Sequence, residues 1–201
     1  MSSTIHFYFD FTSPYGYLAA MRIDQLAAKY AQQVEWHPIL LGVIFKTTGT
    51  LPLVDVPLKG TYSLHDLKRS ARFHAIPFQQ PEHFPISTQN TARAMLWIAN
   101  KLGEDSAIKF AKAAYQAYFV DGINIGEIEH VVQIANRLGF DGDTLANEIS
   151  SPEIKAQLKA EVDAAQEQGV FGAPFVIIDG EPFWGFDRFD QIEALLKNGQ
   201  I

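Results

Sequence analysis

The order of hydrophobic patterns along this chain restricts its fold more than any other feature of the sequence. Residues 5–11 alternate bulky apolar and polar side chains, which is the pattern of a half-buried strand. From residue 14 to residue 30, apolar side chains recur at helical spacing, with Ser13 placed as the N-cap and Pro14 as the first helical residue. Residues 34–39 predict a second strand, so the chain opens with a strand–helix–strand unit.

The C-terminal end of the chain returns from helices to strands. Apolar runs at residues 174–179 and 183–185 surround a turn at Gly180, and helical spacing follows at residues 189–197. Residues 62–169 between the two ends are mostly helical in pattern. This order predicts an α/β protein with a thioredoxin-like fold, βαβ and then ββα, and a large all-helical insertion.

The same patterns predict where the domains divide. We expect residues 1–40 and 170–201 to form the thioredoxin-like domain, and residues 41–169 to form a connecting loop and the helical insertion domain. Residues 45–56 are rich in Thr, Gly, Leu and Pro without a clean period, which predicts an irregular loop that lies over another part of the protein. The clearest helix signal follows Ser151, a serine cap with a proline behind it.

The composition excludes several kinds of chemistry. The chain has 201 residues and no cysteine, so it forms no disulfide and no thiolate metal site, and it has no catalytic thiol of its own. Its net charge of −7 argues against a nucleic-acid partner, which would require a basic face to displace phosphate counterions.

The sequence also lacks targeting and membrane signals. The N-terminus runs directly into the first strand pattern without a basic start, unlike a signal peptide. The longest apolar run, residues 39–45, is far shorter than the roughly 18 residues that a membrane span requires. We therefore expect no membrane partner and a cytoplasmic location.

Ser13 is the first candidate functional residue. A serine followed by a proline at a strand–helix border is a common helix cap, and this ordinary role is the default interpretation. The same position also offers free backbone N–H groups, the positive end of the helix dipole and a hydroxyl donor. It would therefore suit a carboxylate, a phosphate or a thiolate.

A second candidate lies at the start of the strand after the insertion. In a thioredoxin-type arrangement, the bond between Ala173 and Pro174 lies opposite the first helix N-terminus. Most X-Pro bonds are trans, and only about 5–6% are cis. The sequence leaves both forms open here, and a cis bond would turn the backbone of Ala173 outward, where it could pair with an extended peptide.

Several segments, in this order and spacing, resemble the 2-hydroxychromene-2-carboxylate isomerases, which belong with the kappa-class glutathione transferases in the DsbA-like thioredoxin superfamily. The matching segments are FYFDFTSPY at residues 7–15, Gly49 with Pro52, Lys59, Tyr62, Asp66, Arg69, Phe84-Pro85, GVFGAPF at residues 169–175 and WGFDR at residues 184–188. The resemblance runs almost from end to end of the chain, so it is more specific than any single motif.

The resemblance implies a glutathione-dependent enzyme in which Ser13 holds the sulfur of glutathione. It implies that the thiolate adds reversibly to a small aromatic acid and converts 2-hydroxychromene-2-carboxylate to trans-o-hydroxybenzylidenepyruvate. The remaining glutathione contacts implied are backbone contacts of Ala173, the frame Trp184, Gly185 and Phe186, and Asp187 as partner of the γ-glutamyl ammonium group. A homodimer is also implied.

The energy needed to ionise a bound thiol is within reach of such a site. A thiol with a pKa of about 8.5 is only about 3% ionised at pH 7, so a dominant thiolate needs a shift of roughly two units, or about 2.7 kcal/mol. One hydrogen bond to a charged group contributes about 1.5–3 kcal/mol. A helix N-terminus adds about 0.3–1 kcal/mol, and up to about 2 kcal/mol when partly buried. No protein general base is then required.

Two anionic ligands require local positive charge in this acidic chain. Residues 46–72 contain five basic and two acidic side chains, a local charge of +3 if histidine is neutral. Lys46 lies in the expected irregular loop and Lys59 lies between this loop and the helical pattern from residue 62, and we expect both to bind carboxylates. The resemblance places Lys46 and Thr50 at the substrate, and Lys59 is expected at glutathione. The other basic residues here are expected on a solvated helix face.

No metal site is expected, because three of the six histidines, His65, His74 and His83, are nine residues apart, a spacing that suits neither one helix face nor a zinc motif.

Two other functions stay open beside the isomerase. One is a kappa-class glutathione transferase acting on other electrophiles. The other is a non-catalytic thioredoxin-fold binding module in which Ser13 only caps a helix and Pro174 is structural.

Overall fold

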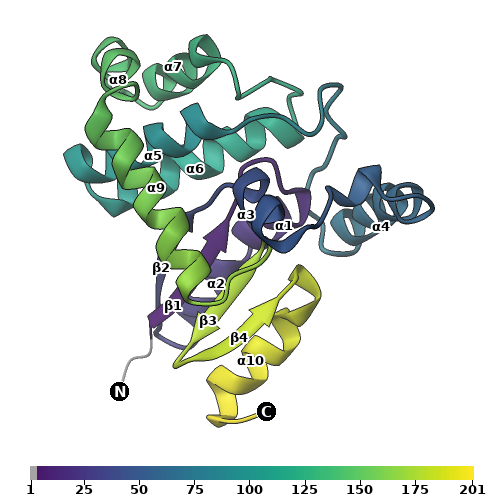
Figure 1. Ribbon diagram of the computed structural model, residues 1–201. Coiled ribbons are helices and arrows are strands. Elements are labelled where there is room, and N and C mark those ends of the chain that lie inside the picture. Colours follow the sequence, from purple (N-terminus) through teal and green to yellow (C-terminus); the bar gives the residue numbers. More distant parts are fainter. Residues whose placement is uncertain (1–3) are drawn as a thin grey trace.

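The computed structural model describes residues 4–201 and contains a four-stranded sheet in the order β2-β1-β3-β4. Strand β1 (Thr4–Phe9) pairs in parallel with β2 (Gln33–Pro38), so that His6 lies opposite Glu35. Strand β3 (Phe175–Ile178) runs antiparallel to β1 on its other side, and β4 (Glu181–Trp184) forms the edge. The thioredoxin-like α/β fold predicted from the sequence is confirmed (Figure 1).

The predicted first helix is two helices, α1 (Pro14–Ala20) and α2 (Ile23–Lys29). The break occurs at Met21 and Arg22, where Arg22 leaves helical geometry with φ −124° and ψ −24°. Neither residue is glycine or proline, so the sequence carries no signal for the break. It lets both Leu18 and Ile23 reach the core, where neither is exposed.

The expected irregular loop at residues 45–56 is also corrected by the structure. Helix α3 (Leu41–Thr48) ends at Gly49, whose left-handed conformation (φ 68°) glycine adopts without strain. A short 3₁₀ helix, η1 (Leu53–Asp55), follows and packs against α4 (Lys59–Phe73). Leu41 and Ile44 of α3 are buried and lie three residues apart, which is a helical spacing. The Thr- and Gly-rich composition concealed this spacing in the sequence.

The helical insertion continues with α5 (Gln89–Leu102), α6 (Glu104–Phe119), α7 (Ile128–Arg137), α8 (Gly142–Glu148) and α9 (Pro152–Glu167). In Figure 1, α5 to α8 gather beyond one end of the sheet, α4 stands apart from them, and α9 returns towards the strands. Ser151 caps α9 as predicted, because its side chain accepts a hydrogen bond from the Ile154 N–H.

The chain ends with η2 (Phe186–Arg188) and α10 (Phe189–Asn198), after the predicted β3–β4 hairpin. One face of the sheet is aromatic: Phe7 and Phe9 contact Trp36 edge-on, and Phe9 also contacts Tyr115 of α6. No helix within residues 4–201 is both long and apolar enough to cross a membrane. All four strands come from residues 4–38 and 175–184, while the expected domain division stays a prediction.

Candidate functional site

Ser13 lies where β1 passes into α1, and it is almost completely buried, with 5% of its surface exposed. It has the extended backbone of an N-cap (φ −83°, ψ 113°), and its Oγ accepts a hydrogen bond of 3.0 Å from the Gly16 N–H. The capping role predicted from the sequence is therefore confirmed. Because α1 has only seven residues, we expect a smaller dipole contribution at Ser13 than a helix reaching Tyr30 would provide.

The Ser13 hydroxyl also reaches the other end of the sequence. It donates a hydrogen bond of 2.9 Å to the carbonyl oxygen of Ala173, and the Ala173-Pro174 peptide bond is cis. The carbonyl oxygen of Pro174 in turn accepts a hydrogen bond of 3.0 Å from the Gly185 N–H. Two hydrogen bonds thus connect the Ala173-Pro174 segment at the start of β3, one to Ser13 and one to Gly185.

Gly16 is closely surrounded by neighbouring atoms. A Cβ atom added there would lie 2.9 Å from the Tyr115 hydroxyl and 3.0 Å from the Ser13 Cβ. Real Cβ atoms almost never lie closer than 3.0 Å to a neighbouring heavy atom. The Tyr115 hydroxyl donates a hydrogen bond of 2.9 Å to the carbonyl oxygen of Asp10. In this backbone, a side chain at Gly16 would therefore displace Tyr115.

The segment after β4 contributes an exposed aromatic ring and an exposed carboxylate. Trp184 is 57% exposed, and its indole ring contacts Phe171 edge-on. Phe186 is buried, whereas the side chain of Asp187 is 74% exposed and lies 3.3 Å from the Arg188 guanidinium. Asp187 does not cap the last helix, because α10 begins after Arg188 and has no side-chain cap.

The predicted lysines lie on helices and not in an irregular loop. Lys46 lies in the last turn of α3, and Lys59 is the first residue of α4. Both are exposed, and neither forms an ion pair within residues 4–201. Thr50 is exposed, and its hydroxyl lies 2.7 Å from the Thr48 hydroxyl. No hydrogen bond given by the structure joins these three residues directly to Ser13.

The sequence did not predict one contact between two of the matching segments. The Tyr15 hydroxyl donates a hydrogen bond of 2.7 Å to Asp66, which links α1 to α4 beside Ser13. Asp66 also pairs with the Arg69 guanidinium. Burial and the hydrogen bond to Asp66 raise the pKa of Tyr15, so its hydroxyl stays protonated as a donor.

Asp10 connects three segments of the chain near Ser13 through hydrogen bonds, a role that the sequence also did not predict. Its carboxylate accepts hydrogen bonds from the Thr88 hydroxyl at 2.6 Å, the Thr12 N–H at 3.0 Å and the Leu41 N–H at 2.7 Å. Burial raises the pKa of Asp10, while these hydrogen bonds oppose that shift. The available signal was one acidic residue within the aromatic run FYFDF.

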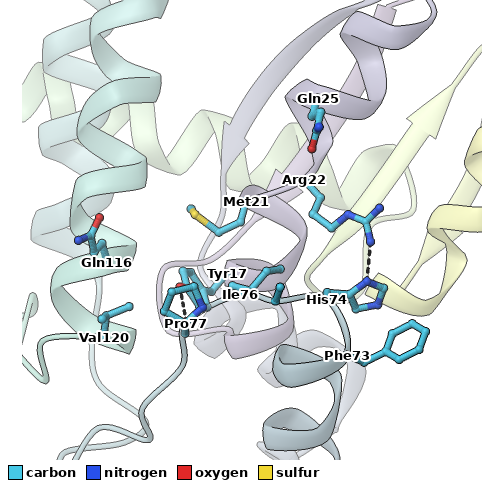
Figure 2. Close-up of a pocket in the computed structure, with 11 residues that line it drawn as sticks. Tyr17, Met21, Arg22, Gln25, Phe73, His74, Ile76, Pro77, Gln116 and Val120 are labelled. Atoms are coloured by element: carbon cyan, nitrogen blue, oxygen red, sulfur yellow. Dashed lines mark hydrogen bonds between the residues drawn. The ribbon is translucent and has the colours of Figure 1, made fainter.

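One cavity lies apart from the predicted site residues. It has a volume of about 660 Å³ and lies between α1–α2, the end of α4 and α6. Figure 2 shows two hydrogen bonds in its lining, between Tyr17 and Pro77 and between Arg22 and His74. None of the predicted site residues lines this cavity. Its lining gives no independent support to the predicted site.

The structure also brings together a cluster of possible metal ligands that the sequence did not predict. His6 and His37 on neighbouring strands lie beside Glu35, with side-chain atoms close enough to hold one ion. The spacing of His65, His74 and His83 gave no indication of this cluster, because its two histidines are 31 residues apart in sequence.

Comparison with known proteins places this arrangement in a family. The DSBA-like thioredoxin domain matches residues 4–197. A 2-hydroxychromene-2-carboxylate isomerase from Sphingobium xenophagum is 32% identical over 98% of this chain and 99% of its own. The chain therefore belongs to the DsbA-like thioredoxin family and, within it, to the family of the 2-hydroxychromene-2-carboxylate isomerases.

Two further relatives are an isomerase of known structure and a kappa-class glutathione transferase. A solved structure of a 2-hydroxychromene-2-carboxylate isomerase aligns with a TM-score of 0.88 at 26% identity, covering 96% of this chain and 94% of that one. Glutathione S-transferase kappa 1 from Homo sapiens is 25% identical and covers 96% of this chain and 90% of its own. Both the isomerases and the kappa-class transferases are thus full-length relatives.

Proposed function

We propose that this protein is a glutathione-dependent isomerase that interconverts 2-hydroxychromene-2-carboxylate and trans-o-hydroxybenzylidenepyruvate in the degradation of aromatic compounds. The observation that carries the proposal is the hydrogen bond from the Ser13 hydroxyl to the Ala173 carbonyl oxygen at the start of α1. In a chain without cysteine, this donor can serve a thiol only if a ligand brings the thiol.

The fit of glutathione depends on how Ser13 uses its single proton. A serine hydroxyl donates one hydrogen bond, and in this structure Ala173 receives it. On binding, Ser13 turns its proton towards the sulfur and the Ala173 carbonyl oxygen accepts an N–H of the ligand. The exchange favours binding, because hydrogen bonds to an anion contribute about 1.5–3 kcal/mol and neutral ones about 0.5–1.5 kcal/mol. The Gly16 N–H bond to Ser13 Oγ holds the oxygen in place during this exchange.

The exposed groups after β4 suit the γ-glutamyl end of glutathione. The Asp187 carboxylate is solvent-exposed and can pair with the ligand ammonium group. Trp184 offers an exposed aromatic face beside it, while Gly185 and the buried Phe186 hold the backbone between them. These residues form the proposed frame of the cofactor.

The unpaired lysines suit the carboxylates of the two ligands. Lys59 begins α4, which Tyr15 links to α1, so it is proposed to bind glutathione. Lys46 and Thr50, at the end of α3, are proposed to bind the carboxylate of the small aromatic acid. An ammonium group without an internal partner loses no ion pair when such an anion binds.

When bound, glutathione supplies the thiolate that adds reversibly to the unsaturated acid and so permits ring opening and rotation. The protein's own residues keep that thiolate ionised through Ser13 and position the acid through Lys46. A homodimer is proposed as well, from the resemblance to the family, and a cytoplasmic location is proposed beside it. No resident metal is required for this reaction.

The decisive experiment follows the absorbance change of 2-hydroxychromene-2-carboxylate with and without glutathione. The isomerase proposal expects turnover that requires glutathione and leaves its concentration unchanged. Equal rates without glutathione contradict the cofactor role.

The full-length match to a kappa-class transferase favours one second candidate, conjugation of glutathione to other electrophiles. In that case glutathione is consumed in proportion to the product. Failure to bind glutathione at all would instead leave a non-catalytic binding module.

A further inference from the structure

One face of the parallel pair β1–β2 carries polar side chains that the proposed reaction does not use. His6 lies opposite Glu35 in the strand register, and Tyr8 lies opposite His37. Since alternate residues of a strand share a face, these four side chains lie together, on the face opposite Phe7. Helix α9 lies on the same side, because its Glu161 reaches His37.

Three potential ligand atoms on this face form a small triangle. The Nδ1 atom of His6 lies 3.2 Å from the Nε2 atom of His37 and 3.2 Å from a carboxylate oxygen of Glu35. The third side, between His37 Nε2 and the same oxygen, measures 3.8 Å. In a tetrahedral zinc site with bonds of about 2.0–2.1 Å, the ligand atoms lie about 3.3–3.4 Å apart. The triangle is therefore close to the size that one such ion requires.

From this geometry we propose that His6, Glu35 and His37 form a binding site for one divalent transition-metal ion. Two imidazole nitrogens and one carboxylate oxygen are a donor set for zinc and its first-row neighbours, whereas magnesium and calcium prefer oxygen ligands alone. The three side chains are 38%, 56% and 23% exposed, respectively, so an ion can reach the site from solvent. A fourth position stays open for water.

The surroundings of His37 orient it for this role. The second ring nitrogen, Nδ1, lies 3.4 Å from a carboxylate oxygen of Glu161. With its proton on Nδ1, His37 directs the lone pair of Nε2 towards His6 and Glu35. Tyr8 stacks on the imidazole, with ring centroids 4.7 Å apart and planes 20° apart, which restricts rotation of the ring. A carboxylate behind a metal-binding histidine is the usual supporting contact in zinc sites.

The charges of the cluster also match a divalent cation. With neutral imidazoles, Glu35 and Glu161 carry two negative charges beside the triangle, which balance the two positive charges of the ion. The cluster contains none of the residues proposed to bind glutathione or the substrate. We therefore expect the ion to link β1, β2 and α9 and to stabilise the folded protein, independently of the isomerase proposal.

Calorimetric titration of untagged, chelator-treated protein with Zn²⁺ alone tests the site. We expect one ion per chain, with an affinity reduced at least 100-fold in His6→Gln and in His37→Gln. Glu161→Gln should weaken binding about 10- to 100-fold, the usual effect of losing such a supporting contact. His65→Gln is the matched control, because His65 is exposed on α4, outside the cluster, and this variant should bind like the original protein.

A second readout separates binding from loss of structure. Co²⁺ bound by the cluster should show the visible absorption bands of a tetrahedral ion, and these bands should be absent in His37→Gln. Circular dichroism of the metal-free variants checks that they are folded. Zn²⁺ should raise the melting temperature of the original protein and of His65→Gln, because a ligand of the native state stabilises it. The proposal is overturned if the original protein shows no saturable binding of one ion. It is also overturned if folded His6→Gln and His37→Gln bind Zn²⁺ with the affinity of the original protein.

Discussion

The hydroxyl of Ser13 lies 2.9 Å from the carbonyl oxygen of Ala173 and donates its one proton to it, so a hydrogen bond joins the start of the first helix to the start of β3. If this proton turns to a bound sulfur, Ser13→Ala should raise the pKa of bound glutathione by about one to two units, since one hydrogen bond to an anion is lost. Turnover should fall by about 100-fold or more, as when a donor is removed from other anion-stabilising sites. Thiolate absorbance in a pH titration measures the first effect, and the isomerase assay measures the second.

Ser151→Ala provides a matched control for this variant. Ser151 also precedes a proline and caps a helix, accepting a hydrogen bond from the Ile154 N–H at 3.3 Å. Both variants lose a cap, at a cost of about 1 kcal/mol each. If Ser151→Ala lowers turnover as much as Ser13→Ala does, the role of Ser13 is only structural.

Gly16→Ala should destabilise the protein by about 1–3 kcal/mol, the usual cost of overpacking a closely packed site. The added methyl group would meet the Tyr115 hydroxyl at 2.9 Å. Tyr115→Phe removes this oxygen, so the double variant should lose less stability than the two single losses together. Urea unfolding of the four proteins measures this coupling.

Gly42→Ala is the control for Gly16→Ala. Gly42 lies within α3, and a Cβ there meets nothing within 4 Å. Alanine should leave stability unchanged or raise it by up to about 1 kcal/mol, because alanine favours helix over glycine. Equal effects at both glycines would contradict the close packing around Gly16.

The sequence predicted the units at both ends of the chain because each carries a strong local pattern. It missed the break at Met21 and Arg22, because nothing at these residues ends a helix locally. It placed Lys46 in a loop, since Thr and Gly obscured the short apolar period of α3. The contact between His6 and His37 depends on the strand register, which no local pattern contains. Ser13 could be singled out because a helix start has its own signature.

Asp10→Asn should destabilise the protein by about 2 kcal/mol or more, the cost of leaving a buried donor unsatisfied. The two oxygens of Asp10 accept from Leu41 on one side and from Thr12 and Thr88 on the other. An amide has only one oxygen, so in either orientation its NH₂ group faces a donor. Urea unfolding measures the loss, and Asp105→Asn, at an exposed position on α6, is the control. Equal losses in both variants would contradict this role of Asp10.

His74 should make the protein less stable as the pH falls below about 6.5, the ordinary pKa of histidine. Burial, followed by the Arg22 guanidinium 2.5 Å from its Nδ1 atom, lowers the pKa of His74 in the folded protein. The unfolded chain then takes up the proton first, so the free energy of unfolding decreases between about pH 7 and pH 5. Because solvent screens this partly buried group, we expect a decrease of less than about 1 kcal/mol. Urea unfolding at pH 7.5 and 5.5 should show a smaller decrease in His74→Gln than in the original protein, and an unchanged one in His65→Gln. The same decrease in His74→Gln as in the original protein would rule out this contribution of His74.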